Sequence, residues 1–323
     1  MIELHTILAI LDATLRVSTP LILCAMAGLF SERSGIIDIS LEGKMLAAAF
    51  AAGTVAALAG SPLLALLAAM LVGIVLGLVH GFACITHRGD QVVSGLAINV
   101  LASGLTVVLG IAWFRQGGQT PALSADARFM PLEFPFTDTL SSIPLIGPLY
   151  TEVISGHNAL VYVALILVPL TWWVVYQTRF GLRLRAVGEN PLAVDTAGIS
   201  VSGLRFGAVV LCGALCGIAG TYLAIAQNAS FVREMTAGQG YIALAAMIFG
   251  KWRPLPAMLA CLMFGFLDAV AIRLQGVVIP NIGEVPVQAI QALPYILTVV
   301  LLAGFIGKAV APKSVGVPFT KER

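Results

Sequence analysis

Runs of about 20 mostly apolar residues recur along almost the whole chain, and they constrain its fold more than any other feature. An α-helix of about 20 apolar residues crosses the roughly 30 Å hydrocarbon layer of a membrane, where every backbone polar group must be paired within the protein. Nine segments are predicted to form such helices: residues 9–30, 42–60, 62–86, 91–113, 158–178, 204–227, 238–250, 255–272 and 288–307. The seventh is short and is expected to be a half-helix or to borrow from its flanks. The sequence therefore predicts an all-α, polytopic transmembrane helical bundle, with residues 1–323 as a single membrane domain.

The composition excludes a soluble protein. Hydrophobic residues make up 59% of the 323 residues and charged residues 11%, whereas soluble domains average roughly 45–50% and about 25%. The formal net charge of +2 comes from scattered Lys and Arg residues, so no concentrated basic face is available to nucleic acid. Soluble enzymes and nucleic-acid partners are therefore not expected.

The Lys and Arg residues of the connecting segments predict the orientation of the bundle, because positive residues stay on the cytoplasmic side of a membrane. They alternate from one connection to the next, and one side receives Arg88, Arg179, Arg183, Arg185, Lys251, Arg253, Lys308, Lys313, Lys321 and Arg323. This side is expected to be cytoplasmic, with the N-terminus outside and the tail 308–323 inside. The segment 114–157, which holds five prolines, is expected outside as a lid-like loop or a plain connector.

Two separated segments share one pattern. Residues 34–53 and residues 233–250 each place a polar, glycine-containing break directly before a helix of small residues. In the predicted topology these two helices run in opposite directions, as an inverted repeat with discontinuous helices requires. Such repeats place a transport pathway at their interface. Chance similarity between Ala/Gly-rich helices is the alternative explanation.

Polar side chains within the apolar segments are the candidates for a transport pathway. A charge at membrane depth costs about 2.5–3.5 kcal/mol on insertion scales, so it usually faces a cavity or a partner group. The predicted pathway residues are Asp38, Glu42, Gln91, Asn99, Gln239, Gln288 and Gln291. For Asn99 and the glutamines, the alternative is a hydrogen bond between helices.

No pattern in the sequence indicates catalysis or metal binding. The chain lacks a GxxxxGK[ST] loop, so the cradle for ATP phosphates would have to come from another chain. Cys212 and Cys216 would share one helix face, but no histidine or carboxylate nearby completes a metal ligand set. We therefore expect no catalytic residue, no metal and no cofactor on this chain.

The most polar stretch between two predicted spans is TRFGLRLRAVGENPLAVDTAGISV, residues 178–201. Asn190 followed by Pro191 is typical of a helix start, and Gly198 is typical of a helix end. A short capped helix on the cytoplasmic side can dock onto a partner, whereas a solvated loop is the alternative.

Four stretches of the sequence resemble one group of transporters. Gly188-Glu189-Asn190-Pro191, followed by Ala197-Gly198-Ile199, resembles the cytoplasmic coupling segment of ATP-binding-cassette (ABC) importer permeases of the branched-chain amino acid and simple-sugar group. Residues 31–46, 90–106 and 235–252 resemble the branch of that group that works with basic-membrane-protein lipoproteins, generally nucleoside importers. The resemblance covers most of residues 14–307. Two residues depart from it: Asp38 stands where an uncharged amide is expected, and Lys44 where an uncharged residue is expected.

The resemblance implies a permease subunit of an ATP-driven importer in the bacterial inner membrane. Its implied partners are a second homologous permease chain, an ATP-binding subunit that carries ATP and Mg, and an external substrate-binding lipoprotein. The implied coupling segment is 179–203, with Gly188, Glu189, Asn190, Pro191, Asp195 and Gly198 as the residues that meet the ATPase. The implied cargo is a small neutral solute, with a purine-type nucleoside favoured.

Two alternatives to a nucleoside importer stay open at this stage. Simple sugars such as ribose are also neutral and rich in hydroxyl groups. An ion-coupled secondary transporter would need a set of buried acids, which only Asp38, Glu42 and Asp268 approach.

Overall fold

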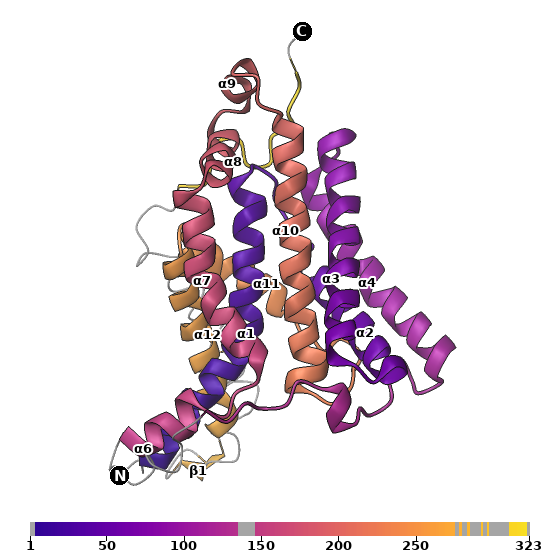
Figure 1. The fold of residues 1–323 in the computed structure, drawn as a ribbon, viewed down its shortest axis with the longest axis vertical. Coiled ribbons are helices and arrows are strands. Elements are labelled where there is room, and N and C mark those ends of the chain that lie inside the picture. Colours follow the sequence, from indigo (N-terminus) through magenta and orange to yellow (C-terminus); the bar gives the residue numbers. More distant parts are fainter. Residues whose placement is uncertain are drawn as a thin grey trace.

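The computed structural model of the chain is a bundle of long helices (Figure 1). It describes residues 4–134, 146–274, 278–279, 283–284, 292, 296 and 310–321. The long helices are α1 (Leu4–Arg33), α2 (Leu41–Ala59), α3 (Pro62–Gly81), α4 (Gln91–Phe114), α7 (Ala159–Gln177), α10 (Val201–Thr221) and α12 (Pro254–Leu274). Seven described helices are long and apolar enough to cross a membrane, so the predicted all-α membrane bundle is confirmed.

Shorter elements join or extend these helices. They are η1 (Phe82–Thr86), η2 (Ala125–Ala127), α6 (Ile146–Pro148), η3 (Leu149–Ile154), α8 (Arg179–Glu189), α9 (Pro191–Thr196), η4 (Tyr222–Gln227) and α11 (Gln239–Phe249), with the antiparallel strand pair β1 (Val278–Ile279) and β2 (Gly283–Glu284). The predicted short span 238–250 is α11, and its 11 residues reach only about half-way across a membrane at 1.5 Å per residue. The predicted span 288–307 lies outside the described residues, apart from 292 and 296.

The sharp turn between α2 and α3 follows from three consecutive residues. Gly60 ends α2 and donates its N–H to the Ala56 carbonyl. Ser61 caps α3 by accepting from Leu64 N, and Pro62 is the first helical residue of α3, where its missing N–H costs nothing. As a result, α2 and α3 form an antiparallel pair.

Small residues bring α3 and α10 together at the centre of the bundle. A side chain on Gly73 would overlap the Gly213 carbonyl, and a side chain on Gly213 would overlap Gly73 in return. In hydrocarbon, where lipid tails are as apolar as side chains, this close van der Waals contact is what holds helices together.

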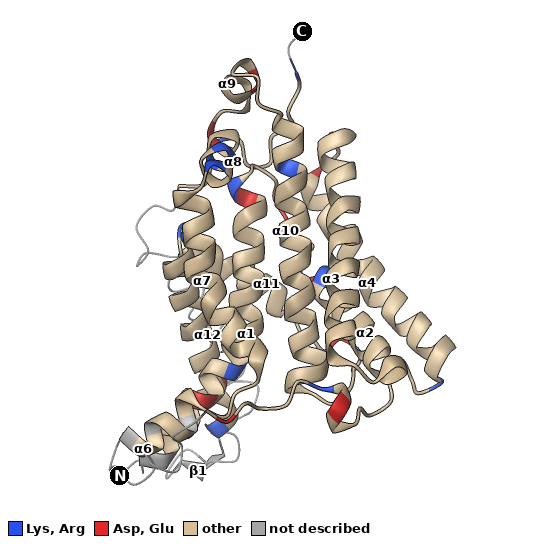
Figure 2. Cartoon of the chain, in the orientation of Figure 1, with Lys and Arg blue, Asp and Glu red and all other residues tan. Residues whose placement is uncertain are grey.

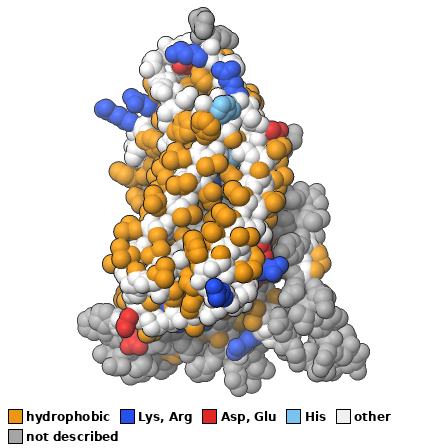
Figure 3. Space-filling model, turned by 90° about the vertical axis from the view of Figure 1, so that its right-hand side faces the viewer, with side chains coloured by type: hydrophobic (Ala, Val, Ile, Leu, Met, Phe, Trp, Pro, Cys, Tyr) orange, Lys and Arg blue, Asp and Glu red, His pale blue; other side chains and the backbone are white. Residues whose placement is uncertain are grey.

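Most of the charged residues lie toward the two ends of the bundle, and Lys and Arg are frequent near α8 (Figure 2). Between the ends, hydrophobic side chains cover the face shown in Figure 3. On α4, for example, Val100 is 74% exposed and Val108 63% exposed. A soluble protein would bury such a surface, so its exposure indicates contact with lipid or with a partner helix.

The first part of the segment 114–157 is folded against the end of α10 and the residues after it. Thr120 N donates to the Phe231 carbonyl at 3.1 Å, and Leu123 N donates to the Ala229 carbonyl at 2.8 Å. The Phe231 ring also meets Phe50 of α2 edge to face, with ring centres 5.2 Å apart. This described part is therefore a packed structure.

Candidate functional site

The centre of interest is the break between α1 and α2, residues 34–40, which is largely buried although it is not helical. Its backbone groups are paired by polar side chains from neighbouring helices. Ile37 N donates to Gln91 Oε1 at 2.6 Å, and the Ile37 carbonyl lies 2.9 Å from His80 Nε2. Asn99 Nδ2 donates to the Ile39 carbonyl at 3.0 Å. The break meets the requirement that irregular backbone at membrane depth be satisfied within the protein.

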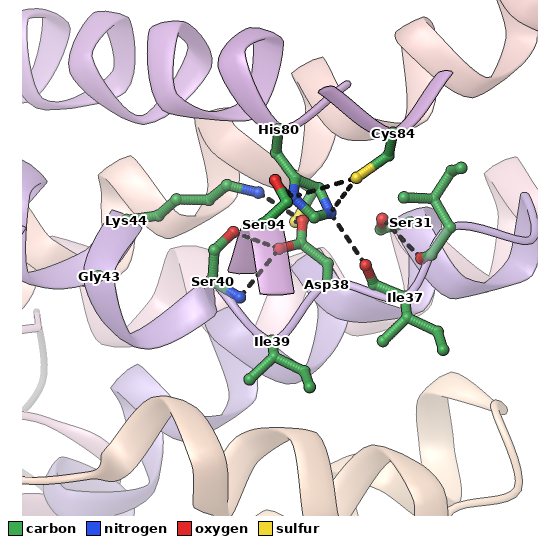
Figure 4. A network of polar contacts seen from close by, with 12 residues as sticks. Ser31, Ile37, Asp38, Ile39, Ser40, Gly43, Lys44, His80, Cys84 and Ser94 are labelled. Carbon is green, nitrogen blue, oxygen red and sulfur yellow. Dashed lines mark hydrogen bonds and ion pairs between the residues drawn. The ribbon is translucent and has the colours of Figure 1, made fainter. Parts of the chain in front are cut away.

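A buried ion pair anchors the break (Figure 4). The Lys44 ammonium contacts the Asp38 carboxylate, and both side chains are 0% exposed. Ser40 donates to Asp38 through its hydroxyl and its backbone N–H. Cys212 of α10 lies 3.2 Å from the same carboxylate, which ties α10 to the break. The two residues that depart from the family pattern are therefore each other's partners.

Glu42 joins α2 to the half-helix α11. Its carboxylate accepts from Gly238 N at 2.8 Å and from Gly240 N at 2.6 Å. These N–H groups lie at the start of α11, where the helix itself provides no acceptors and its dipole favours a negative charge. The start of α11 is thus held on the first turn of α2.

Asn99 of α4 connects the same elements from a third side. Its Oδ1 accepts from Gly43 N at 2.8 Å, and its Nδ2 donates to the Tyr241 hydroxyl at 2.9 Å as well as to the break. Gln239 lies beside this group at the start of α11, and its Oε1 is buried without a partner among the described residues. Gln91 Nε2 is in the same situation.

The structure brings five predicted pathway residues to one region: Asp38, Glu42, Gln91, Asn99 and Gln239. Gln288 and Gln291 lie outside the described residues. Gln91 and Asn99 make the hydrogen bonds between helices that the alternative interpretation requires. Contact of any of these side chains with a solute stays a prediction.

From their meeting point α2 and α11 run in opposite directions. The far end of α2 leads into α3, whereas the far end of α11 reaches the end of α1. There Arg33 donates to the Trp252 carbonyl at 2.6 Å, and Trp252 Nε1 donates to Glu32 at 2.5 Å. The opposite directions of α2 and α11 are those predicted for the helices that follow the two polar breaks. An inverted repeat that relates residues 34–53 to residues 233–250 stays a prediction.

The predicted coupling segment contains two helices. Asn190 caps α9 by accepting from Ala193 N at 3.1 Å, Pro191 is its first residue, and the chain leaves the helix by Gly198, as predicted. The preceding residues form α8, which sequence reasoning missed. The buried positions of α8 are Gly181, Leu184, Val187 and Gly188. Their spacing of three to four residues is typical of one helix face and could have predicted α8 from the sequence.

Gly188 lies at the contact between α8 and the end of α1. A side chain there would overlap the Arg33 carbonyl oxygen. Glu189 and Asn190, by contrast, are exposed. The predicted coupling residues therefore divide into one that packs inward and neighbours that face outward.

The C-terminal residues 310–321, here called the tail segment, join the coupling segment to the break. Ser314 Oγ donates to the Gly188 carbonyl at 2.7 Å, and Gly316 N donates to the Gly35 carbonyl at 3.1 Å. Arg205 of α10 donates to the carbonyls of Ser34, at 3.2 Å, and Val317, at 3.4 Å. The sequence alone gave no sign of these contacts.

A solved structure shows the same fold. It is a metal-chelate type ABC transporter in an inward-facing conformation, similar with a TM-score of 0.50 at 16% identity over 94% of this chain and 89% of that chain. At this identity the likeness concerns the fold alone.

Sequence relatives are closer. The nucleoside ABC transporter permease protein NupC of Lactococcus lactis is 40% identical over 99% of both chains. The guanosine ABC transporter permease protein NupQ of Bacillus subtilis is 39% identical over 97% of this chain and 96% of its own. The ribose import permease protein RbsC of Escherichia coli is 25% identical over 72% of this chain and 68% of its own.

The family of branched-chain amino acid transport system permease components matches residues 10–306. That match covers nearly the whole chain and includes the break, the half-helix α11 and the coupling segment. This protein therefore belongs to that family of transport permeases.

Proposed function

We propose that this chain is a permease subunit of an ABC importer that carries nucleosides across the bacterial inner membrane. The observation that carries the proposal is the identity of about 40% over nearly the full chain with permeases for nucleosides and guanosine. The ribose permease is a more distant relative that matches a smaller share of the chain. A purine nucleoside is the cargo we favour.

The charges of the break support a neutral cargo. Asp38 is neutralised by Lys44, and Glu42 is occupied by two N–H groups of α11. The groups left near them are the Gln239 and Gln91 amides and the Tyr241 hydroxyl. Amides and hydroxyls suit the hydroxyl groups and base edges of a nucleoside, whereas a phosphorylated nucleotide would need a cluster of cations. We therefore propose that Gln239, Gln91 and Tyr241 line the pathway, with Asn99 holding the Tyr241 hydroxyl in place.

The proposal includes partner chains. An ATP-binding subunit would dock on α8 and α9 from the cytoplasm, with the exposed Glu189 and Asn190 at the contact. A second permease chain and an external binding lipoprotein would complete the importer. The tail segment, on the same end as α8, would then lie in the cytoplasm. These assignments agree with the Lys and Arg residues of the α8 end and with the absence of an ATP-binding loop in the sequence.

Uptake measurements test the proposed cargo. Radiolabelled guanosine, adenosine, uridine and ribose are supplied to cells with the gene, without it, and with the gene restored on a plasmid. Loss of nucleoside uptake that the plasmid restores would support the proposal and rank the bases. Loss of ribose uptake alone, with all nucleoside uptake unchanged, would refute it.

A further inference from the structure

A groove of about 960 Å³ lies between α7 and α12 at the α8 end of the bundle, and none of its lining residues belongs to the break. Three arginines from different elements line it: Arg33 at the end of α1, Arg185 of α8 and Arg253 just before α12. The rest of its wall is aromatic or aliphatic and includes Trp172, Leu165 and Met258. Cations and apolar surface thus share one groove.

Among the described residues, no ion pair neutralises the positive charge of the groove. Within the described part of the chain, none of the three arginines has a carboxylate within 4.0 Å. Arg33 donates to two neutral groups, the Trp252 carbonyl at 2.6 Å and the Tyr176 hydroxyl at 3.2 Å, so its charge is not compensated by them. Arg185 stacks over the Tyr176 ring at 4.8 Å and donates through Nε to the Val175 carbonyl at 3.1 Å, which leaves its two terminal nitrogens for another partner. Arg253 is exposed.

The apolar wall extends from the arginines toward the middle of the bundle. Leu255 is 56% exposed and Trp172 is 47% exposed. The Trp172 ring contacts the ring of Tyr176, which lies one helical turn further along α7 and closer to the arginines. Tryptophan and tyrosine are typical of the level of lipid headgroups. The groove therefore runs from headgroup level to the depth of acyl chains.

We propose that this groove binds an anionic phospholipid, with its phosphate headgroup on Arg33, Arg185 and Arg253 and an acyl chain along α7 and α12. A free anion would use only the arginines, and a zwitterionic lipid would leave their charge uncompensated. Basic pockets between membrane helices on the cytoplasmic side are suited to acidic headgroups, and the orientation proposed above places the groove on that side. The lipid would also lie against Arg33, which holds the far end of α11 through the Trp252 carbonyl. It would thereby stabilise the junction of α1, α11 and α12.

The test uses the full-length chain, purified in mild detergent with the subunits with which it assembles and then depleted of lipid. Thermal unfolding is measured after addition of phosphatidylglycerol, phosphatidylcholine or inorganic phosphate at equal concentrations. Phosphatidylglycerol is expected to raise the Tm of the wild type by several degrees. The shift is expected to fall by at least half in R185Q/R253Q and to stay at the wild-type value in R88Q/R233Q. This control removes two exposed arginines that lie outside α8 and α9 and do not line the groove.

The outcomes distinguish an anionic-lipid site from a general lipid effect and from a simple anion site as the cause of a Tm shift. Equal shifts in R185Q/R253Q and the wild type would overturn the proposal. An equal shift from phosphatidylcholine would indicate general lipid dependence, and an equal shift from inorganic phosphate a simple anion site, and each of these results would also overturn it. If the double variant does not fold, R253Q alone decides, because Arg253 is exposed; an undiminished shift in R253Q would refute a site that includes it. Failure of the nucleoside assignment would leave all these measurements unaffected.

Discussion

Asp38 and Lys44 neutralise each other in the interior of the protein, one in the break and the other in the first turn of α2. Neither side chain has an exposed atom, and the carboxylate also accepts from Ser40. A solute that passed through this region would therefore meet a paired charge. The pair belongs to the framework of the break.

Removing one member of this pair is expected to be worse than removing both. Asp38→Asn or Lys44→Met alone leaves one buried charge without a partner, which costs about 3–5 kcal/mol, whereas loss of both charges is often nearly neutral. The amount of folded protein in membranes and its Tm in detergent should therefore be low for the single variants and substantially recovered in D38N/K44M. Additive losses in the double variant would show that the two charges act independently.

Loss of the Glu42 carboxylate is expected to free the start of α11. Glu42→Ala removes both acceptors for Gly238 N and Gly240 N, a loss of roughly 1–2 kcal/mol by analogy with helix caps. Hydrogen exchange measured by mass spectrometry should accelerate in the first turn of α11, and uptake should fall. Glu133→Gln, at an exposed carboxylate remote from α11 in sequence, is the control. Unchanged exchange in Glu42→Ala would mean that the half-helix is held by other contacts.

A side chain at Gly188 is expected to separate α8 from α1. The added Cβ of Gly188→Ala would overlap the Arg33 carbonyl, whereas at Gly207 of α10 the nearest atom is 3.7 Å away. Gly188→Ala should therefore lower uptake and substrate-stimulated ATP hydrolysis while insertion into the membrane is retained, and Gly207→Ala should keep both activities.

Glu189→Lys, at an exposed position, is expected to lower uptake by weakening the ATPase contact. Wild-type transport in Gly188→Ala and Glu189→Lys would exclude coupling through this segment.

A thiol in place of the Gln239 amide, whose Oε1 has no partner among the described residues, is expected to be accessible from the pathway. The five native cysteines are all buried, so background labelling should be small. Gln239→Cys should react with a polar thiol reagent, and guanosine should slow the reaction. Leu259→Cys, on the exposed apolar side of α12, should react little because a charged reagent does not enter lipid. Protection of residue 239 in every nucleotide state would place it in packing away from the pathway.

The helices could be predicted from the sequence because each spanning segment carries its own signal. Eight predicted spans, including the short one that became α11, coincide with described helices, with ends that differ by a few residues. The 11-residue α8 was not predicted, because its three arginines make the segment polar overall and only a few apolar residues, such as Leu184 and Val187, mark its buried face. Local hydropathy is therefore sufficient for the spans and insufficient for the short helices between them.

The contacts within the site could be predicted only in part. Polar residues at membrane depth drew attention to Asp38, Glu42 and Asn99, but their partners lie on other helices and depend on how these pack. His80 carries no distinguishing signal in the sequence, although its ring nitrogens lie 2.9 Å from the Ile37 carbonyl and 3.0 Å from Ser94 Oγ. The pairing of Asp38 with Lys44 had a signal in the sequence, since two opposite charges replaced two uncharged residues within a few positions.

The tail segment also bears on the order in which the protein is made. Gly35 and Ser34 leave the ribosome early, whereas Gly316 and Val317, which meet them directly or through Arg205, follow only after every described helix has been synthesised. Contacts between such distant parts of a chain form late, because the intervening loop must close first. The break therefore acquires its final contacts only after the described helices have been synthesised. An incomplete chain would expose an unfinished break at the same end as α8, where a protease could distinguish it from a finished permease.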